Sequence, residues 1–527
     1  MKPPALLRTA AALGLTLSAN VLSAQSTKSV ATPDHIKFIL TALAHDSMEG
    51  RGTGTRGSMR AAKFIASQFQ AAGLTPAGDS GFFQHVPMAT RMTDPSSTIT
   101  VDGTTLRAGS DFAVTAGRVK PRSLDGVAVI YGGMRNDPDP LTPDQVRGKL
   151  VIFSAAPIAT GARGGGAAGG GGRPPAPTSC RDLPADAAPV VAAPRGGGGG
   201  GGRGGRGGLG GNNAFADAAG IATIEGDQLS ARTVWGAKHT GTAFVKDPSA
   251  PAPTMAPAAA TVSITSHAAT VLLGAPITGL AKGAAGKTIH SSVKFVERPA
   301  TGGNVVGIVE GSDPTMKNQV ILVDAHYDHL GIAMPPAGST DSIYNGADDD
   351  ASGTTAVIEI ARALKAGPPP KRTVVLIATT GEEVGLLGTN WYIAHPVRPL
   401  SQMAANLEIE MMDRPDALAG GPGKAWLTGF ERSTLGDTLA AHGLPIVKDP
   451  RPDQSFFSRS DNIAFARMGI PAHTLSSFDL HADYHQSNDD VNLADFNHMA
   501  GVIDAGISVV RLLADGFTPV WYPNCKP

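Results

Sequence analysis

The chain has 527 residues, and its 44 basic and 45 acidic side chains leave a net charge of -1. This length exceeds that of one typical domain and predicts at least two. Because a nearly neutral chain exerts no general attraction on nucleic acids or anionic membranes, we expect no nucleic-acid binding. No stretch after the first two dozen residues looks transmembrane, so we expect no stable membrane insertion. A hydrophobic content of 42% and a charged content of 17% are typical of a globular protein and exclude a wholly disordered one.

The first two dozen residues have the order of a secretory signal. Lys2 and Arg8 supply the positive charge, and an apolar run follows from Thr9 to Leu22. Small residues around Ala24 then suit a cleavage site. The apolar run is shorter than the roughly 20 residues that span a bilayer. We therefore expect residues 1–24 to be a signal peptide and the protein to be periplasmic or extracellular.

Cysteine and glycine usage is uneven along the chain. Only Cys180 and Cys525 are present, which excludes a disulfide framework and leaves open whether these two pair after export. Of the 66 glycines, 21 fall within residues 161–211. Because glycine-rich chain buries too little apolar surface to offset its ordering entropy, we expect a mobile surface loop there. Its Arg-Gly-Gly repeats hold few arginines and no aromatic residues, which argues against RNA binding.

Two amphipathic helices are expected near the N-terminus, over Pro33–Leu43 and Ser58–Ala72, because apolar residues recur there at helical spacing. Gly73 follows the second helix as a C-cap glycine would. The glycines of residues 52–57 literally match the dinucleotide-binding fingerprint, but they follow a helix and not a strand. We therefore reject dinucleotide binding.

The middle of the chain has a different texture. Short β-prone runs such as Gly126–Ile130, Lys149–Phe153 and Ala260–Ile264 are separated by turn residues. We expect residues 115–290 to form a separate β-rich module that contains the glycine-rich tract.

After Phe295 the pattern becomes that of an α/β domain. The expected strands are Val305–Val309, Gln319–Ala325, Thr373–Ala378 and Leu407–Met411, and the helices that alternate with them are Ala351–Leu364 and Gly385–Ala394. Strands that are apolar without alternation suit a sheet covered on both faces. We therefore expect an α/β fold with a mostly parallel central sheet and helices on both faces, and functional residues just beyond the strand ends.

Three clusters of possible metal donors lie at such ends. His326-Tyr-Asp328 follows one strand, and Glu382-Glu383 follows another. Asp348-Asp-Asp350 stands immediately before a helix. Nitrogen and carboxylate donors without thiolates suit catalytic zinc.

These clusters, in their order and spacing, resemble the co-catalytic di-zinc exopeptidase family. The strings that carry the resemblance are His326-Tyr-Asp328, Asn345-Gly-Ala-Asp-Asp-Asp-Ala-Ser-Gly353, Thr380-Gly-Glu-Glu-Val-Gly-Leu-Leu-Gly388 and Asp483-Tyr-His485. The family includes secreted bacterial leucyl aminopeptidases, yeast aminopeptidase Y, glutamate carboxypeptidase and the non-enzymatic transferrin receptor. The resemblance implies a phosphorylase/hydrolase-like peptidase domain built from residues 33–114 and 291–517. It also implies that residues 115–290 are an inserted protease-associated domain.

The family resemblance also implies a ligand set for two Zn2+ ions. Asp349 would bridge both ions. His326 and Glu410 would complete one site, and Glu383 with His485 the other. Most members have aspartate where this chain has Glu410, so the added methylene leaves the geometry or occupancy of that site open.

Further roles follow from the same resemblance. Glu382 would be the general base, and Asp328 would accept a hydrogen bond from the imidazole of His326 and so fix its tautomer. Tyr484 is a candidate donor to the oxyanion of the tetrahedral intermediate, the alternative being a packing tyrosine. Asp413 is the alternative to Glu410 as a metal ligand.

The function that these expectations imply is that of an exported zinc aminopeptidase. It would hydrolyse N-terminal residues from peptides by metal-activated water, with Glu382 as the base. One alternative is a carboxypeptidase of the glutamate carboxypeptidase type. Another, from a different class, is a non-catalytic binding protein like the transferrin receptor. The sequence leaves the oligomeric state open.

Overall fold

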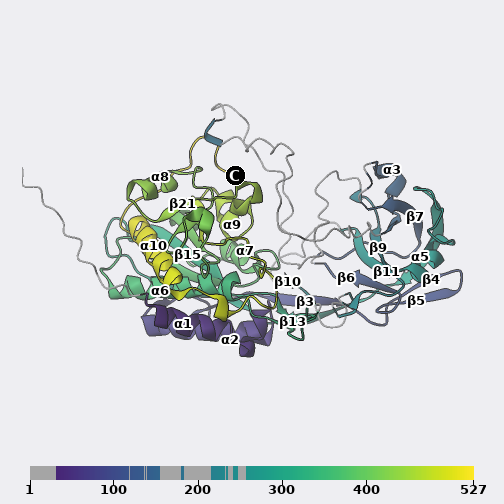
Figure 1. Cartoon of the computed structure of the whole chain (residues 1–527), viewed down its shortest axis with the longest axis horizontal. Coiled ribbons are helices and arrows are strands. Elements are labelled where there is room, and N and C mark those ends of the chain that lie inside the picture. The colour runs from purple at the N-terminus through teal and green to yellow at the C-terminus, as the bar shows by residue number, and fades with distance from the viewer. Residues whose placement is uncertain are drawn as a thin grey trace, which may run out of the picture.

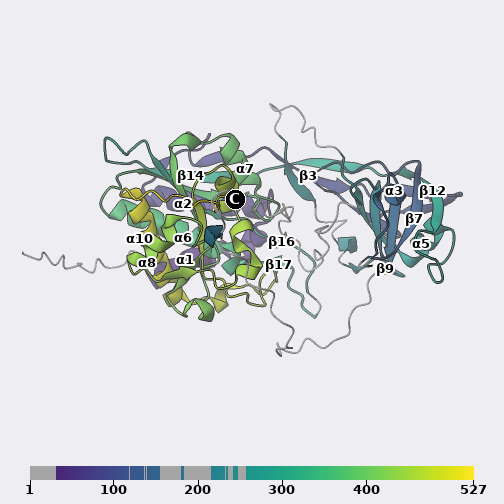
Figure 2. The ribbon, with the colours of Figure 1, turned by 90° about the horizontal axis from the view of Figure 1, so that it is seen from above.

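The computed structural model describes residues 31–117, 119–135, 137, 139–154, 180–182, 215–231, 233–235, 241–246, 257–336 and 338–527. The expected signal peptide lies outside these residues, as does the glycine-rich tract except for Cys180–Asp182. Figures 1 and 2 show two lobes along the long axis of the molecule, an α/β lobe that contains both ends of the described chain and a β-rich lobe.

A mixed sheet of nine strands in the described residues forms the centre of the α/β lobe. Its strands are β1 (Thr75–Pro76), β2 (Phe83–His85), β14 (Gly303–Val309), β15 (Val320–His326), β18 (Thr373–Thr379), β19 (Met403–Ile409), β20 (Ala425–Leu427), β21 (Ile446–Lys448) and β22 (Ala472–Ser476). The order is β1-β14-β18-β15-β19-β22-β20-β21, and β2 also pairs with β14. The four central strands β18, β15, β19 and β22 are parallel. β14 is antiparallel to its neighbours, and β20 is antiparallel to β22 but parallel to β21. The expected α/β fold is therefore confirmed, with its parallel part at the centre.

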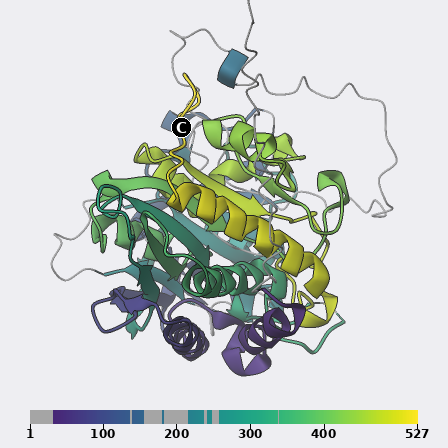
Figure 3. The same cartoon turned by 90° about the vertical axis from the view of Figure 1, so that its left-hand side faces the viewer.

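Helices cover both faces of this sheet (Figure 3). They are α1 (Pro33–Leu43), α2 (Arg56–Ala72), α6 (Gly353–Ala366), α7 (Leu387–Ala394), α8 (Thr434–Ala441), α9 (Asn462–Arg467) and α10 (Phe496–Ala514). Because successive side chains of a strand point to opposite faces, Val374 lies in the hydrophobic cluster that includes α1, α2, α6 and α10, whereas Val375 lies in the cluster that includes α7 and α9. All residues of β15 and β18 are buried. No helix in the described ranges has both the length and the apolar character needed to cross a membrane.

The two N-terminal helices begin and end for local reasons. α1 has the expected bounds, and Thr32 caps it by accepting a hydrogen bond from the amide of His35 at 3.4 Å. α2 begins two residues earlier than expected because Thr55 is its N-cap. Gly73 ends α2 with a φ of 79°, the left-handed conformation that favours glycine.

The β-rich lobe contains an eight-stranded sheet with the order β5-β4-β12-β7-β8-β9-β11-β6. Its strands are β4 (Thr98–Val101), β5 (Thr104–Arg107), β6 (Phe112–Thr115), β7 (Val127–Met134), β8 (Leu150–Ser154), β9 (Gly220–Gly226), β11 (Ala260–Thr265) and β12 (Ala285–Ser292), with the helices α3 (Pro143–Val146) and α5 (Ser266–Leu273) beside them. The residues of this sheet extend beyond the expected range of 115–290 at both ends. The hairpin β4–β5 pairs with β12, and β6 pairs with β11, so the lobe begins at Thr98 and ends at Ser292.

A three-stranded sheet connects the two lobes. It consists of β3 (Met88–Thr93) between β10 (Thr242–Val245) and β13 (Phe295–Ala300). β3 and β13 pair along their whole length, so the chain enters and leaves the β-rich lobe through adjacent antiparallel strands (Figure 1).

Cys180 and Cys525 form a disulfide bond, a pairing that the sequence left open. The next residue, Arg181, binds the carboxylate of Asp437 at 3.0 Å, and its guanidinium lies 3.9 Å from the ring centre of Tyr522. The segment 180–182 is thus attached to the C-terminal part of the α/β lobe.

Candidate metal centre

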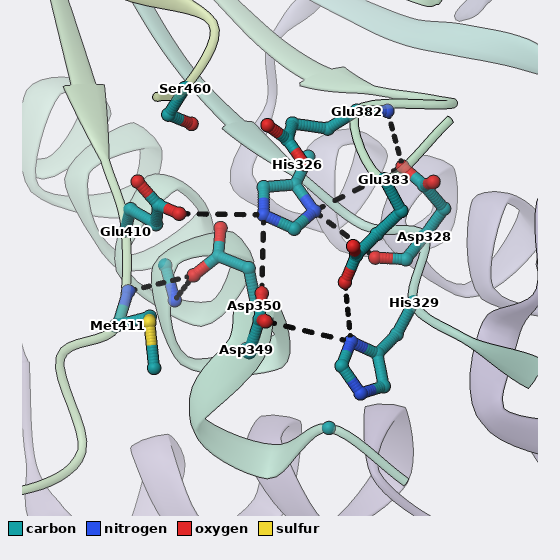
Figure 4. A network of polar contacts seen from close by, with 12 residues as sticks. His326, Asp328, His329, Asp349, Asp350, Glu382, Glu383, Glu410, Met411 and Ser460 are labelled. Atoms are coloured by element: carbon teal, nitrogen blue, oxygen red, sulfur yellow. Dashed lines mark hydrogen bonds and ion pairs between the residues drawn. The ribbon is translucent and has the colours of Figure 1, made fainter. Parts of the chain in front are cut away.

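The expected site residues meet where the central parallel strands end. His326, the last residue of β15, pairs with Thr379, the last residue of β18. The chain beyond β18 therefore carries Glu382 and Glu383 past the end of β15. Figure 4 shows these two glutamates pointing in different directions from the same loop.

The register of β19 brings Glu410 to the same edge. Asp324 of β15 pairs with Glu408 of β19, so Glu410, two residues later, is level with His326. Glu410 Oε1 lies 3.9 Å from His326 Nε2 (Figure 4). Asp413, the alternative ligand, instead has Oδ1 3.3 Å from the Nε of Arg414.

Asp349 comes from the turn Ala347–Ser352 that precedes α6. Its peptide bond to Asp350 is cis. Asp489 holds the turn, since its carboxylate accepts hydrogen bonds from the amides of Asp348 and Asp349, each at 3.1 Å. Gly346 begins the turn with a φ of 56°, and a Cβ there would lie 2.2 Å from the carbonyl oxygen of Asp349. Only glycine fits this close approach.

Two groups of donor atoms share the carboxylate of Asp349. On one side, its Oδ1 lies 3.4 Å from His326 Nε2. On the other side, its Oδ2 lies 2.9 Å from His485 Nε2, which is 3.3 Å from Glu383 Oε1. The structure thus brings together the five side chains that the family resemblance implied as ligands.

His329 also belongs to this cluster, although the sequence interpretation missed it. Its Nδ1 lies 2.9 Å from Glu383 Oε1 and 3.8 Å from Asp349 Oδ2 (Figure 4). The only signal in the sequence was a second histidine three residues after His326. A residue beyond a strand end has no periodicity that would indicate where its side chain points.

The cluster has the properties of a metal site. His326 Nε2 and Glu383 Oε1 are buried, and neither atom makes a hydrogen bond within the described part of the chain. Burial alone would raise the pKa of Asp349, but the adjacent imidazoles of His326 and His485 hold it well below its usual range. Buried polar atoms without partners are costly unless a bound group completes them. Imidazole nitrogens and carboxylate oxygens around one shared carboxylate fit zinc.

Comparison with known proteins agrees with this site. Residues 304–510 match the model of Peptidase family M28. These residues, called the M28 domain for this similarity, contain every metal donor named above.

Curated relatives match shorter segments. A probable zinc metalloprotease of Pyrenophora teres is 35% identical over 113 residues, 21% of this chain and 22% of its own length. A probable leucine aminopeptidase 2 of Aspergillus oryzae is 28% identical over 226 residues, 38% of this chain and 42% of its own length. Aminopeptidase YwaD of Bacillus subtilis is 31% identical over 113 residues, 21% of this chain and 22% of its own length. The matches therefore span less than half of each of these relatives.

Solved structures resemble the chain over nearly its whole length. An aminopeptidase from Aneurinibacillus sp. strain AM-1 has a TM-score of 0.52 at 17% identity, covering 94% of this chain and 96% of that one. The zinc aminopeptidase BSAP from Bacillus subtilis has a TM-score of 0.50 at 16% identity, covering 92% and 96%. At such identities the likeness concerns the fold.

Glu382 lies at the edge of the donor cluster of the M28 domain and is 9% exposed. Burial raises its pKa well above the usual range, and the negative charges of Glu383 and Glu410 act in the same direction. A carboxylate whose proton affinity is raised in this way is suited to accept a proton.

Asp328 faces the His326 imidazole with its backbone carbonyl and not with its carboxylate. The Nδ1 of His326 lies 3.1 Å from the carbonyl oxygen of Asp328, whereas the Asp328 carboxylate is 4.0 Å away. That carboxylate already accepts hydrogen bonds from three other donors, the amides of Gly381 and Glu382 and the hydroxyl of Thr53. Asp328 therefore orients His326 through its backbone and holds the Glu382 loop through its side chain.

Tyr484 is partly buried beside the donors. Its ring stacks on that of His485, with centroids 3.9 Å apart and planes 22° from parallel. Burial raises the pKa of the Tyr484 phenol well above its usual range, and the charges of Asp349 and Glu383 raise it further. The hydroxyl therefore stays protonated and can donate a hydrogen bond.

Arg51 connects the N-terminal segment to the two ligand loops of the M28 domain. Its side chain is fully buried, at 0% exposure. The guanidinium donates to four backbone carbonyl oxygens at 2.5–2.9 Å, those of Leu43, Tyr327, Asn345 and Gly346, and to that of Asp349 at 3.4 Å. A planar five-donor fork fixes the three segments relative to one another.

Proposed function

We propose that the protein is an exported zinc aminopeptidase that binds two Zn2+ ions and removes N-terminal residues from peptides. The observation that carries this proposal is the convergence of imidazole and carboxylate donors on both sides of Asp349, with Glu382 beside them. The family M28 match supports a peptidase. The names of the Aspergillus and Bacillus relatives support the aminopeptidase activity.

The roles of the side chains follow from their positions. When bound, the zinc ions would polarise the scissile carbonyl and make a water molecule more acidic. Glu382 would take a proton from the attacking water and return it to the leaving amine. The protonated hydroxyl of Tyr484 would donate a hydrogen bond to the oxyanion of the tetrahedral intermediate.

The decisive experiment is the Glu382→Gln variant assayed on aminoacyl substrates with and without a chelator. We expect kcat to fall by about 10²–10⁴ while zinc content stays at the wild-type level, because only the proton acceptor is lost. Glu310→Gln, in an exposed glutamate far from the donors, is the matched control and should hydrolyse at the wild-type rate. Wild-type turnover by Glu382→Gln contradicts the proposal. A wild-type protein with no zinc and no hydrolysis favours the non-catalytic binding role.

Arg459 is the observation that favours a second candidate, the carboxypeptidase. Its guanidinium lies 5.0 Å from the ring centre of Phe456, and its charge acts on the phenol of Tyr484. An exposed cation beside the site could bind an α-carboxylate. Peptides blocked at the amine or at the carboxylate distinguish the two activities. Cleavage of amine-blocked peptides that is weakened in Arg459→Met supports the carboxypeptidase.

Export and the nature of the β-rich lobe belong to the same proposal. The disulfide between Cys180 and Cys525 supports an oxidising compartment, in agreement with the expected signal at residues 1–24. We propose that the lobe Thr98–Ser292 is the protease-associated insert, which the adjacent entry and exit strands β3 and β13 support. Detection of the mature protein in the periplasmic or culture fraction, starting near Gln25, tests the export.

A further inference from the structure

His329 is buried without the partners that a structural histidine has. It lies three residues beyond the end of β15, and its ring is 0% exposed. Neither ring nitrogen makes a hydrogen bond within the described residues. By contrast, both nitrogens of the buried His473 have partners, Thr428 and Ser433. An unpartnered buried imidazole is costly, so a bound group at His329 would explain its position.

Two oxygens that would bind a metal ion lie close to the His329 ring. Nδ1 lies 2.9 Å from Glu383 Oε1 and 3.8 Å from Asp349 Oδ2. The same two oxygens lie 3.3 and 2.9 Å from His485 Nε2. Four-coordinate zinc with bonds of 2.0–2.1 Å separates its ligand atoms by about 3.3 Å. The four observed distances fall on both sides of this value.

A hydrogen bond from His329 to Glu383 does not account for the contact. Although the two atoms lie 2.9 Å apart, neither makes a hydrogen bond within the described structure. His326 Nε2, an expected ligand, is in the same situation beside Asp349. Nitrogen and oxygen atoms that lie close together without a hydrogen bond are arranged as ligands around a shared cation would be.

We propose that His329 is a metal ligand through Nδ1 and completes, with Asp349, Glu383 and His485, the metal site on the Glu383 side. This inference rests on the proposed zinc site and adds a residue to it. It makes the two halves of the centre unequal. The Glu383 half has two imidazoles and a 4% exposed carboxylate, whereas the His326 half has one imidazole and the 24% exposed Glu410. Zinc should therefore bind the Glu383 half more tightly.

Zinc titration of the metal-free full-length protein tests the ligand. We expect two binding events in the wild type and, in His329→Gln, a loss of at least tenfold in the affinity of the tighter one. His498→Gln is the matched control, because His498 is a buried histidine whose nitrogens bind Gly423 and Ser477. It should keep both wild-type affinities. Wild-type zinc affinities in a folded His329→Gln protein overturn the proposal.

X-ray absorption at the zinc edge separates a ligand from a residue that only positions Glu383. The fully loaded wild type should have three imidazoles per two zinc ions, and His329→Gln should have two. A wild type with two imidazoles per two ions overturns the role of His329 and leaves the proposed function intact. If His329→Gln fails to fold, the wild-type count alone decides. A wild type that binds no zinc contradicts the proposed function itself.

Discussion

The two lobes differ in what they bury. In the α/β lobe, carboxylates are buried around and beneath the strand ends, among them Asp324, Asp348, Asp349, Asp350, Glu383, Glu408, Asp413, Asp461 and Asp489. In the β-rich lobe, the described residues contain no buried aspartate, glutamate or histidine, and the interior is a cluster of aliphatic and aromatic side chains. Burying a charge is costly unless it is paired or bound, so a lobe that buries many has a function that requires them. The chemistry therefore belongs to the α/β lobe, and the β-rich lobe is stabilised by ordinary packing.

The largest expected effect is that of Arg51→Met. It leaves the carbonyl oxygens of both ligand loops without donors and the nearby carboxylates without a cation, which should cost about 4 kcal/mol of folding stability and lower zinc affinity. Arg122→Met is the matched control, because Arg122 also donates to two backbone carbonyls, but in the β-rich lobe. Denaturant unfolding and zinc titration measure both effects. If the two variants lose equal zinc affinity, the contrast between the lobes is wrong.

Ile152→Ala tests the packing of the β-rich lobe. Ile152 is fully buried in β8, and truncating it leaves a cavity that should cost about 3 kcal/mol in the unfolding of the β-rich lobe. Because none of the proposed metal ligands lies in that lobe, zinc affinity and peptide hydrolysis at 25 °C should remain unchanged. Limited proteolysis and thermal unfolding locate the damage. A fall in zinc content would mean that the lobes are energetically coupled.

The sequence predicts most of the fold where the pattern is periodic. α1 appears with its expected bounds because its apolar residues recur at helical spacing. β19 begins at Met403, four residues before the expected start, because the buried Asn406 and Glu408 interrupt its apolar pattern. β22, Ala472–Ser476, was not predicted for the same reason, since His473 and Thr474 are buried polar residues. The α/β lobe buries many polar side chains, and these residues interrupt the apolar pattern from which its strands would be predicted.

The residues of the site also differ in how well the sequence predicts them. The donors that stand in recognisable strings were predicted, whereas His329 and Arg51 were not. The hydrogen bonds of Arg51 reach carbonyls up to 298 positions away, so nothing near it in sequence indicates its role. Asp328 was predicted to accept a hydrogen bond from His326, and it contacts that imidazole through its backbone carbonyl, because Thr53 and the loop after β18 occupy its carboxylate. Which donors reach the Asp328 carboxylate depends on the packing of distant segments, so the sequence does not predict it.

The pH dependence of stability should also distinguish the lobes. Burial lowers the pKa of His473 to about 4, below its value of about 6.5 in an unfolded chain. Protons therefore bind the unfolded state more strongly, and the stability that His473 contributes above pH 6.5 is lost as the pH falls toward 4. Between pH 7 and pH 5 this amounts to about 2 kcal/mol.

The test compares unfolding free energies at these two pH values. In His473→Asn, the decrease from pH 7 to pH 5 should be about 2 kcal/mol smaller than in the wild type. His290 lies on the exposed face of β12 with 74% of its side chain accessible, so His290→Asn should leave the wild-type decrease unchanged. If the unfolding free energy decreases equally in all three proteins, then His473 does not take up a proton when the protein unfolds.

The smallest expected effect concerns Glu410, which stands where most members of the di-zinc exopeptidase family that the sequence resembles have aspartate. Glu410 Oε1 is already 3.9 Å from His326 Nε2, farther than the 3.4 Å between Asp349 and the same nitrogen. Removing a methylene draws the carboxylate back toward β19, so Glu410→Asp should bind zinc about tenfold more weakly at the His326 half, or about 1.4 kcal/mol. The Glu383 half should keep its affinity, and Glu310→Asp should change neither. If Glu410→Asp instead binds zinc more tightly, then the backbone after β19 moves freely enough to follow the shorter side chain, and the two halves of the centre are less unequal than their static contacts indicate.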